Sequence, residues 1–329
     1  MTYKNGNVIM KKNKGKEKNM KLNKKLITDK FDKKNHYQLC LMCVLPVFLV
    51  LVFSYLPMGG MIIAFKDYRY DLGILGSKWV GLDNMIYFLK TNDFWNITAN
   101  TLYLNSIFIV VGMSSSIALA VLLFEITSRK CVKVYQTILI TPFFMSWVIV
   151  GYISYAFLSP EYGLMNTIIQ KMGMDPVSWY TTPEAWPWIL TIFSTWKSVG
   201  MDSIYYYAAL MGIDKTYFEA ARIDGANKMT MIRKIVIPEL VPLIILLFIM
   251  RIGGIFNADF GLFYQLTRDV GALYSTTDVI DTYIFRTMRV LGDMSLSSAV
   301  GVLQSVVGFI LVLITNYAAK KIDPSSGIF

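Results

Sequence analysis

Long apolar windows without a charged side chain constrain this chain more than any other feature of its sequence. Four such windows cover residues 35–65, 94–124, 134–160 and 294–319. The hydrocarbon core of a bilayer is about 30 Å thick and is crossed by roughly 20 apolar residues in a helix, so each window predicts one transmembrane helix. The composition agrees, because only 16% of the residues are charged, against about 25% in soluble domains.

Two weaker windows complete this prediction. Residues 186–212 and 240–258 are long enough to cross but contain Lys197, Asp202 and Arg251. We therefore predict an all-α integral membrane protein with six transmembrane helices. Their expected bounds are 39–64, 102–124, 134–158, 186–212, 239–258 and 296–319.

The net charge of +10 is concentrated at the N-terminus. Residues 1–38 hold 12 Lys and no Arg against three acidic residues, and the rest of the chain is close to neutral. This excess predicts a Lys-rich, disordered tail over residues 1–36, followed by a membrane domain over residues 37–329. A basic tail of this kind favours contact with anionic lipid, and no nucleic-acid partner is expected.

The distribution of Lys and Arg predicts the orientation in the membrane. With the N-terminus inside, the inner segments hold 22 of these residues and the outer segments hold eight. Cytoplasmic segments carry the excess in membrane proteins, so both termini are predicted to be cytoplasmic in a plasma-membrane protein. The third outer segment has apolar residues at helical spacing between residues 278 and 290, which predicts a surface-lying helix.

The inventory of reactive residues excludes several chemistries. The chain has one His and three Cys, too few for a His-based triad, a metal site or a disulfide framework. Cys40 and Cys43 lie in an apolar run, where packing is the expected role. No GxxxxGK[ST] phosphate loop is present, so the chain is not expected to hydrolyse ATP by itself. We expect no catalytic residue, no metal and no cofactor in this chain.

The predicted cytoplasmic loop over residues 214–238 has clear helix signals. Asp214 can cap a first helix over residues 215–224, and Gly225 can end it. A second helix then runs until Pro238 opens the fifth span. Physical reasoning alone leaves an ordinary amphipathic loop as the alternative to a docking element.

The loop resembles the EAA loop of the membrane subunits of binding-protein-dependent ABC importers. The residues that carry the resemblance, at the family's spacing, are Glu219, Ala220, Ala221, Gly225, Ile235, Ile237 and Pro238. Ile237 is the one departure, since the family usually has Leu there. Further segments resemble the carbohydrate branch, most of all the complex-oligosaccharide permeases related to maltose-type permeases. They are WVGLDN (79–84), NTLYLNS (100–106), TWKSVG (195–200), DVIDTYIFR (278–286) and NYAAKKI (316–322).

The resemblance covers residues 37–329 and implies a type I ABC importer permease fold. Such a chain forms half of a pathway for an oligosaccharide, together with a second homologous permease. Two ATPase subunits hold the ATP and Mg, and an extracellular solute-binding protein delivers the substrate. The EAA loop would be a coupling helix that docks on an ATPase subunit. The expected coupling residues are Glu219, Ala220, Ala221, Asp224, Gly225, Ile235 and Pro238.

Three alternatives remain at this point. The same scaffold could import another solute. A self-sufficient secondary transporter would usually show internal repeats, and none is evident in this sequence. A membrane-embedded hydrolase or transferase is disfavoured, because no set of residues supplies a catalytic centre.

Ionisable residues within spans usually mark a pathway or a buried pair. At about 1.5 Å rise per residue, Asp202 lies roughly 15 Å and Arg251 roughly 18 Å from the inner ends of their helices. The similar depth predicts that they face each other, either as a structural ion pair or as substrate contacts. Lys197 lies one to two turns further out.

Sugar sites combine aromatic ring faces with amide, carboxylate and hydroxyl groups. Residues of these types on or near the two interrupted spans are Trp196, Lys197, Tyr205, Tyr206, Asn257, Asp259 and Tyr264. Asn257 and Asp259 lie in GIFNADF, which is similar to the segment where maltose-type permeases place substrate-contacting amides. The acid at Asp259 replaces the second amide and predicts a different sugar specificity. The alternative for the aromatic residues is a role as interfacial anchors.

Overall fold

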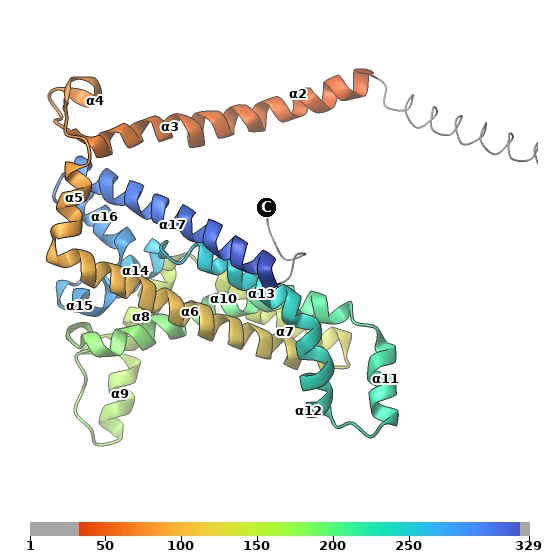
Figure 1. The fold of residues 1–329 in the computed structure, drawn as a ribbon. Helices are drawn as coiled ribbons and strands as arrows, with labels where there is room; N and C mark the ends of the chain where they lie inside the picture. Colours follow the sequence, from red (N-terminus) through yellow and green to blue (C-terminus); the bar gives the residue numbers. More distant parts are fainter. Residues whose placement is uncertain (1–32, 323–329) are drawn as a thin grey trace, which may run out of the picture. The chain divides into compact units, whose positions relative to one another are not determined.

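The computed structural model describes residues 33–322, and the first 32 residues of the predicted tail lie outside this range. The chain divides into two compact units, residues 1–61 and 62–329. The first unit contains one long helical segment, drawn in orange-red in Figure 1. Its elements are α2 (Lys33–Val50), the π-turn η1 (Leu51–Tyr55), α3 (Leu56–Met58) and the beginning of η2 (Gly59–Phe65).

The second unit begins with a short hairpin that the sequence prediction omits. Strand β1 (Lys66–Asp67) pairs antiparallel with β2 (Lys78–Trp79), and α4 (Gly73–Gly76) lies between them. Asn84 ties the hairpin to helix α5 (Asp83–Lys90), because its side-chain amide donates to the carbonyls of Ala64 and Lys66, each at 3.0 Å. The prediction of an all-α protein is therefore wrong in one detail, since the chain contains this two-stranded β-sheet.

Two long helices form the centre of the second unit. Helix α6 (Asn92–Phe124) runs for 33 residues, because its sequence is apolar and contains neither Pro nor a charged residue after its first turn. Helix α10 (Trp186–Met211) starts with Pro187 in its first turn, where the missing N–H would have no helical partner. The two helices pack along each other. They share a buried cluster with α13 that includes Ala120, Tyr206 and Leu240.

The predicted third span is not a single straight helix. Helix α7 (Arg129–Ile140) passes into the 3₁₀ turn η3 (Thr141–Phe144), and α8 (Trp147–Leu158) follows at an angle of 96° to this segment. Pro142 occupies the turn, and Ser146 caps α8 by accepting from the N–H of Ile149 at 3.4 Å. A proline that interrupts one helix, followed by a residue that caps the next, lets the chain change direction. The apolar window continues through this bend and does not predict it.

The loop between α10 and α13 contains two helical pieces. Helix α11 (Lys215–Ile223) stands apart from α12 (Lys228–Met231), as Figure 1 shows. Helix α12 then continues through the π-turn η6 (Ile232–Val236) into α13 (Ile237–Gly253) without a break. Proline has no backbone N–H to donate to the preceding turn, and its ring crowds the carbonyl four residues back. The π-turn just before Pro238 is wider than an α-helical turn and so accommodates the proline within a continuous helix. The predicted second loop helix and fifth span are thus one helix.

The fifth span ends earlier than predicted, because helix α13 stops at Gly253 and residues 254–259 are not helical. The chain then forms a group of short helices and the final long helix. These elements are α14 (Phe260–Thr267), η7 (Gly271–Leu273), α15 (Tyr274–Thr277), α16 (Ile280–Arg289) and α17 (Met294–Ile322). Helix α16 confirms the helix predicted between residues 278 and 290. Between α8 and α10 lie α9 (Leu164–Lys171), η4 (Trp179–Thr181) and η5 (Pro183–Ala185).

Length and composition qualify four described helices as membrane-crossing segments, or five if the bent pair counts as one crossing. They are Cys40–Phe65, Asn92–Phe124, Lys228–Gly253 and Met294–Ala318, with α7–η3 and α8 as the bent pair. Helix α10 has 26 residues, but Lys197, Asp202 and several hydroxyl-bearing residues lower its hydropathy. The described residues therefore contain membrane-crossing helices, but this criterion identifies four or five of them and not the predicted six.

Candidate functional site

The break after α13 places backbone and polar side chains at the centre of the second unit. Non-helical backbone at membrane depth needs protein or water partners for its polar groups. Three side chains from three helices supply them here. Asn105 of α6 donates to the carbonyl of Ile255 at 2.7 Å. Gln304 of α17 donates to the carbonyl of Phe256 at 2.7 Å.

The third partner is Asp281 of α16, which accepts from the N–H of Ala258 at 2.8 Å and from Gln304 Nε2 at 3.1 Å. Burial raises the pKa of Asp281, while these hydrogen bonds act in the opposite direction. The break is thus held in one conformation by residues far apart in the sequence. We refer to Asn105, Asp281 and Gln304 as the break cradle.

A cavity of about 310 Å³ opens beside the break. It brings together four of the predicted polar residues, Lys197, Arg251, Asn257 and Asp259, with aromatic and hydroxyl-bearing residues of other elements. The latter are Phe108, Phe143, Trp147, Ser194 and Ser198. Flat ring faces next to amide and charged groups are the chemistry expected of a sugar-binding cavity.

Lys197 bridges the cavity and the bend between α7 and α8. Its Nζ donates to the carbonyl of Phe143 at 2.8 Å. The same nitrogen lies 5.0 Å from the ring centroid of Trp147 and 5.3 Å from that of Phe143, both within cation–π range. The ammonium group thus lies among two rings and a carbonyl at the cavity wall.

Asp202 and Arg251 are in direct contact, as their similar predicted depth suggests. Arg251 Nη2 lies 2.6 Å from Asp202 Oδ2. Arg251 also lines the cavity, whereas Asp202 lies behind it with a largely covered side chain. Pairing reduces the cost of each charge inside a span.

Asp259 closes the cavity at the start of α14. Its Oδ1 caps this helix by accepting from the N–H groups of Gly261 and Leu262, at 3.0 and 3.3 Å. Its Oδ2 accepts from the indole N–H of Trp147 at 2.7 Å. The carboxylate therefore joins α8 to α14 and has partners on both oxygens.

Four predicted aromatic residues lie elsewhere. Trp196 lines an apolar hollow beside α8 and α9, and the side chain of Tyr205 is exposed on the surface of the chain. Tyr206 is buried in the cluster between α6, α10 and α13. Tyr264 stacks on Phe260, with ring centroids 5.0 Å apart, and borders a different hollow. None of these four lines the cavity at the break.

Trp147 and Asn105 also belong to this region and are not among the predicted site residues. Trp147 follows Ser146, a good helix cap, just after Pro142, so the TPFFMSW segment contains a signal for a bend with an aromatic residue at its exit. Asn105 lies within the NTLYLNS segment, as a polar residue in an apolar window. Such a residue is by default a candidate for a polar contact inside the protein.

The predicted loop forms the expected local structure. The Asp214 side chain accepts from the N–H of Thr216 at 2.9 Å and caps α11. This hydrogen bond lowers the pKa of Asp214. Gly225 has a φ of +76°, the left-handed conformation that ends helices and that glycine adopts without strain. Asn227 caps the next helix by accepting from the N–H of Thr230 at 2.8 Å.

Most of the predicted coupling residues are accessible. Glu219, Ala220, Asp224, Gly225 and Pro238 are exposed, while Ala221 and Ile235 are half-buried. Two contacts tie the loop to the end of α6. The Phe124 and Phe218 rings pack with centroids 5.8 Å apart, and Lys228 Nζ lies 2.8 Å from Glu125 Oε2.

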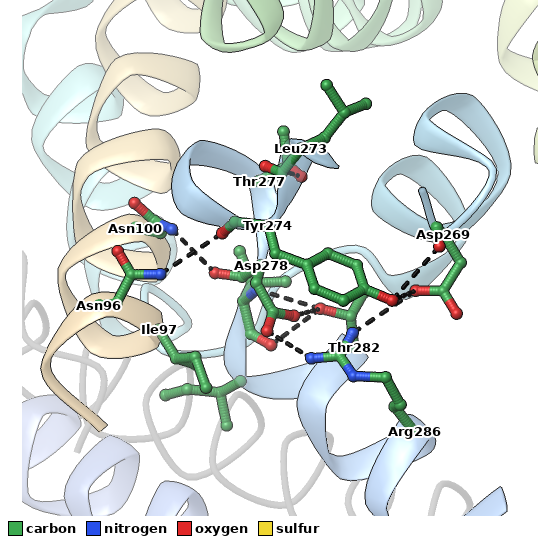
Figure 2. A network of polar contacts seen from close by, with 12 residues as sticks. Asn96, Ile97, Asn100, Asp269, Leu273, Tyr274, Thr277, Asp278, Thr282 and Arg286 are labelled. Carbon is green, nitrogen blue, oxygen red and sulfur yellow. Dashed lines mark hydrogen bonds and ion pairs between the residues drawn. The ribbon is translucent and has the colours of Figure 1, made fainter. Parts of the chain in front are cut away.

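A polar network lies at the other end of α6 (Figure 2). Arg286 of α16 pairs with Asp278, lies 3.5 Å from Asp269 and covers the ring of Tyr274 at 4.1 Å. Thr282 donates to Asp278 at 2.8 Å. Burial raises the pKa of Asp278, and the charge of Arg286 acts in the opposite direction.

Two side-chain amides of α6, one of the two central helices, donate hydrogen bonds to this network. As Figure 2 shows, Asn96 points toward the carbonyl of Tyr274 and Asn100 toward that of Asp278, at 3.4 and 3.2 Å. The network therefore fixes α15 and α16 against α6, and α16 in turn carries Asp281 of the break cradle.

A family profile described as "Binding-protein-dependent transport system inner membrane component" matches residues 104–324. The matched region includes the cavity, the loop and α16, and spans more than half of the chain. The chain belongs to this family of inner membrane transport components.

Two relatives of this transport component come from Bacillus subtilis strain 168. Protein LplB is 36% identical over 279 residues, which cover 85% of this chain and 87% of the relative. The polygalacturonan/rhamnogalacturonan transport system permease protein YteP is 34% identical over 306 residues, covering 93% and 92%.

Solved structures agree with the assignment of this transport component. A bacterial ABC transporter involved in the import of the acidic polysaccharide alginate matches with a TM-score of 0.80 at 33% identity, covering 89% of this chain and 98% of the matched one. The alginate ABC transporter in complex with an alginate pentasaccharide-bound periplasmic protein matches with a TM-score of 0.79 at 33% identity, covering 88% and 96%.

Proposed function

We propose that this chain is the permease subunit of an ABC importer for an oligosaccharide, and that the cavity at the helix break is part of its translocation pathway. The observation that carries the proposal is the meeting of ring faces, an amide and charged groups at one non-helical break in the membrane domain. The names of the relatives support it, since YteP and the alginate transporter are described as polysaccharide transport systems.

In this proposal the chain forms half of the pathway, and a second homologous permease forms the other half. Six segments cross the membrane, with α10 and the bent α7–α8 pair among them and both termini in the cytoplasm. An extracellular solute-binding protein delivers the substrate, as in the alginate transporter solved with a periplasmic protein. The count of Lys and Arg supports this orientation.

The loop over residues 214–238 couples the pathway to two ATPase subunits, which hold ATP and Mg. Its exposed first helix carries Glu219 and Ala220, and its left-handed turn is at Gly225. The ties from Phe218 and Lys228 to the end of α6 support a mechanical role, because a push on α11 is passed to a central helix.

Reconstitution tests the proposal. The chain would be produced with its cognate ATPase, second permease and binding protein, and the complex assembled into proteoliposomes. We expect ATP-dependent uptake of an oligosaccharide that requires the binding protein. Uptake by this chain alone, driven by an ion gradient, would instead identify a secondary transporter.

A further inference from the structure

Lys197 carries a charge whose counter-ion is missing from the described structure. Its Nζ donates to the carbonyl of Phe143 at 2.8 Å. Within residues 33–322, no carboxylate oxygen lies within 4.0 Å of this nitrogen. An ammonium group inside a span is unfavourable unless protein, water or ligand compensates its charge.

The other charges at the cavity already have partners. Arg251 is paired with Asp202 at 2.6 Å. Asp259 accepts from Trp147 at 2.7 Å and from the two N–H groups that begin α14. Arg251 is thus paired with Asp202 and Asp259 is held by neutral N–H donors, so neither supplies an ion-pair partner in contact with Lys197.

The surroundings of Lys197 fit one part of a sugar acid in particular. The Trp147 ring lies 5.0 Å from Nζ and lines the same cavity, so a ligand that pairs with the ammonium group also lies beside the indole ring. A uronic acid residue has an apolar ring face and a carboxylate at its edge. Aromatic stacking against that face and an ion pair at that edge would use both groups.

We infer that the cavity recognises an acidic sugar residue, with the substrate carboxylate pairing with Lys197 and the sugar ring resting on Trp147. This inference rests on the proposed function and specifies its substrate class. A substrate carboxylate supplies the missing counter-charge, so the ammonium group is fully compensated only while substrate passes. Neutral sugars can accept a hydrogen bond from Lys197 but provide no opposite charge.

The test uses the reconstituted complex with its ATPase and binding protein, and a panel of trisaccharides. The panel contains galacturonate, guluronate and mannuronate trimers, their full methyl esters, and neutral hexose trimers. Uptake by the wild type is compared with that of Lys197→Met and Lys197→Arg. Lys171→Met, an exposed lysine at the end of α9, is the matched control.

The wild type is expected to take up an acidic trimer. Lys197→Met should lower this uptake about tenfold or more, because it leaves the substrate carboxylate unpaired. Lys197→Arg should retain most of it, and Lys171→Met should match the wild type. Uptake of any ester or neutral trimer that is transported should change less than about twofold in Lys197→Met, a difference of well under 1.4 kcal/mol.

Other results overturn the inference. Equal loss for acidic and uncharged trimers would mean that Lys197 only supports the bend through Phe143. Unchanged acidic uptake in Lys197→Met would exclude the ion pair. Wild-type uptake restricted to neutral trimers would exclude an acidic substrate while leaving the proposed function intact. No uptake of any trimer by an assembled, ATP-hydrolysing complex would count against the proposed function itself.

Discussion

The carboxylate of Asp281 accepts a hydrogen bond of 2.8 Å from the backbone N–H of Ala258, across 23 residues of sequence. Asp281 lies on the short helix α16, and Ala258 lies in the break between α13 and α14. Since Ala258 is buried, this N–H has little access to water. The conformation of the break therefore depends on a residue of a different helix.

Asp281→Ala should destabilise the protein by about 1–3 kcal/mol, because it leaves a buried N–H without an acceptor. Asp281→Asn should lose less, because Ala258 and Gln304 both donate to Oδ2 and the amide oxygen of Asn can take the place of that atom. Thermal unfolding in detergent measures both. Asp71→Ala, at an exposed ion pair with Arg69, is the control and should change stability by less than about 0.5 kcal/mol. Equal stability of Asp281→Ala and this control would contradict the cradle.

Removal of Arg286 should destabilise the protein in a pH-dependent manner. Burial raises the pKa of Asp278 above its ordinary value of 3.8 even with Arg286 beside it. A raised folded-state pKa means that the group's contribution to stability is greatest below its ordinary pKa and declines as the pH rises through the folded-state pKa. Without Arg286 the pKa rises further, because the favourable positive charge is gone.

Arg286→Met should therefore cost about 3–5 kcal/mol near neutral pH, the range for an uncompensated buried charge. The loss should shrink as the pH is lowered from neutral toward the raised pKa of Asp278, because the carboxyl group becomes protonated. The double variant Asp278→Asn/Arg286→Met should recover part of the stability and lose most of this pH dependence. A loss that does not change with pH would show that Arg286 acts through packing on Tyr274.

Gly200 marks the closest approach of α10 to α7. A Cβ built at this position would lie 1.9 Å from the carbonyl oxygen of Leu139, which is backbone and cannot rotate away. Gly200→Ala should destabilise by about 1–3 kcal/mol through overpacking. Gly112→Ala in α6 is the matched control, since nothing lies within 4 Å of its added Cβ. Similar melting temperatures for the two variants would contradict this packing.

A substitution at Gly225 tests the turn of the proposed coupling loop, because an added side chain would meet no neighbouring atom. The φ of Gly225 is +76°, and no atom lies within 4 Å of an added Cβ. Gly225→Val should strain the turn by about 1–2 kcal/mol and lower binding-protein-stimulated ATPase activity of the complex. Gly225→Asn should retain activity, because Asn tolerates the left-handed region. Full activity of Gly225→Val would mean that the turn does not need this conformation.

Local signals predicted most of what lies in one segment of sequence. The cap at Asp214 and the stop at Gly225 depend on neighbouring residues, and the structure has helix ends at these positions. The apolar windows predicted the long helices for the same reason. To predict the contact between Asp202 and Arg251, it was enough to compare their depths in the membrane from the rise per residue of a helix.

Contacts between distant segments were beyond this reasoning. Trp147 donates to Asp259 across 112 residues, and Asn105 to Ile255 across 150. Hydropathy also hides the bend at Pro142 and the early end of α13 at Gly253, because apolar residues continue through both. Trp196 and Tyr205 have the right chemistry, but Trp196 lies on the opposite face of α10 from the cavity-lining Ser198, and Tyr205 lies about two turns further along the helix.

Capture of a transported oligosaccharide at the helix break tests the central claim most directly. A photo-crosslinking amino acid would replace Asn257, which lines the cavity, or Trp196, which lines a separate apolar hollow. The complex in proteoliposomes would receive labelled oligosaccharide on its binding protein, with ATP. We predict labelling at position 257 that requires ATP and the binding protein, and none at position 196. Labelling at 196 but not at 257, or labelling at 257 without either partner, would contradict a substrate pathway through this cavity.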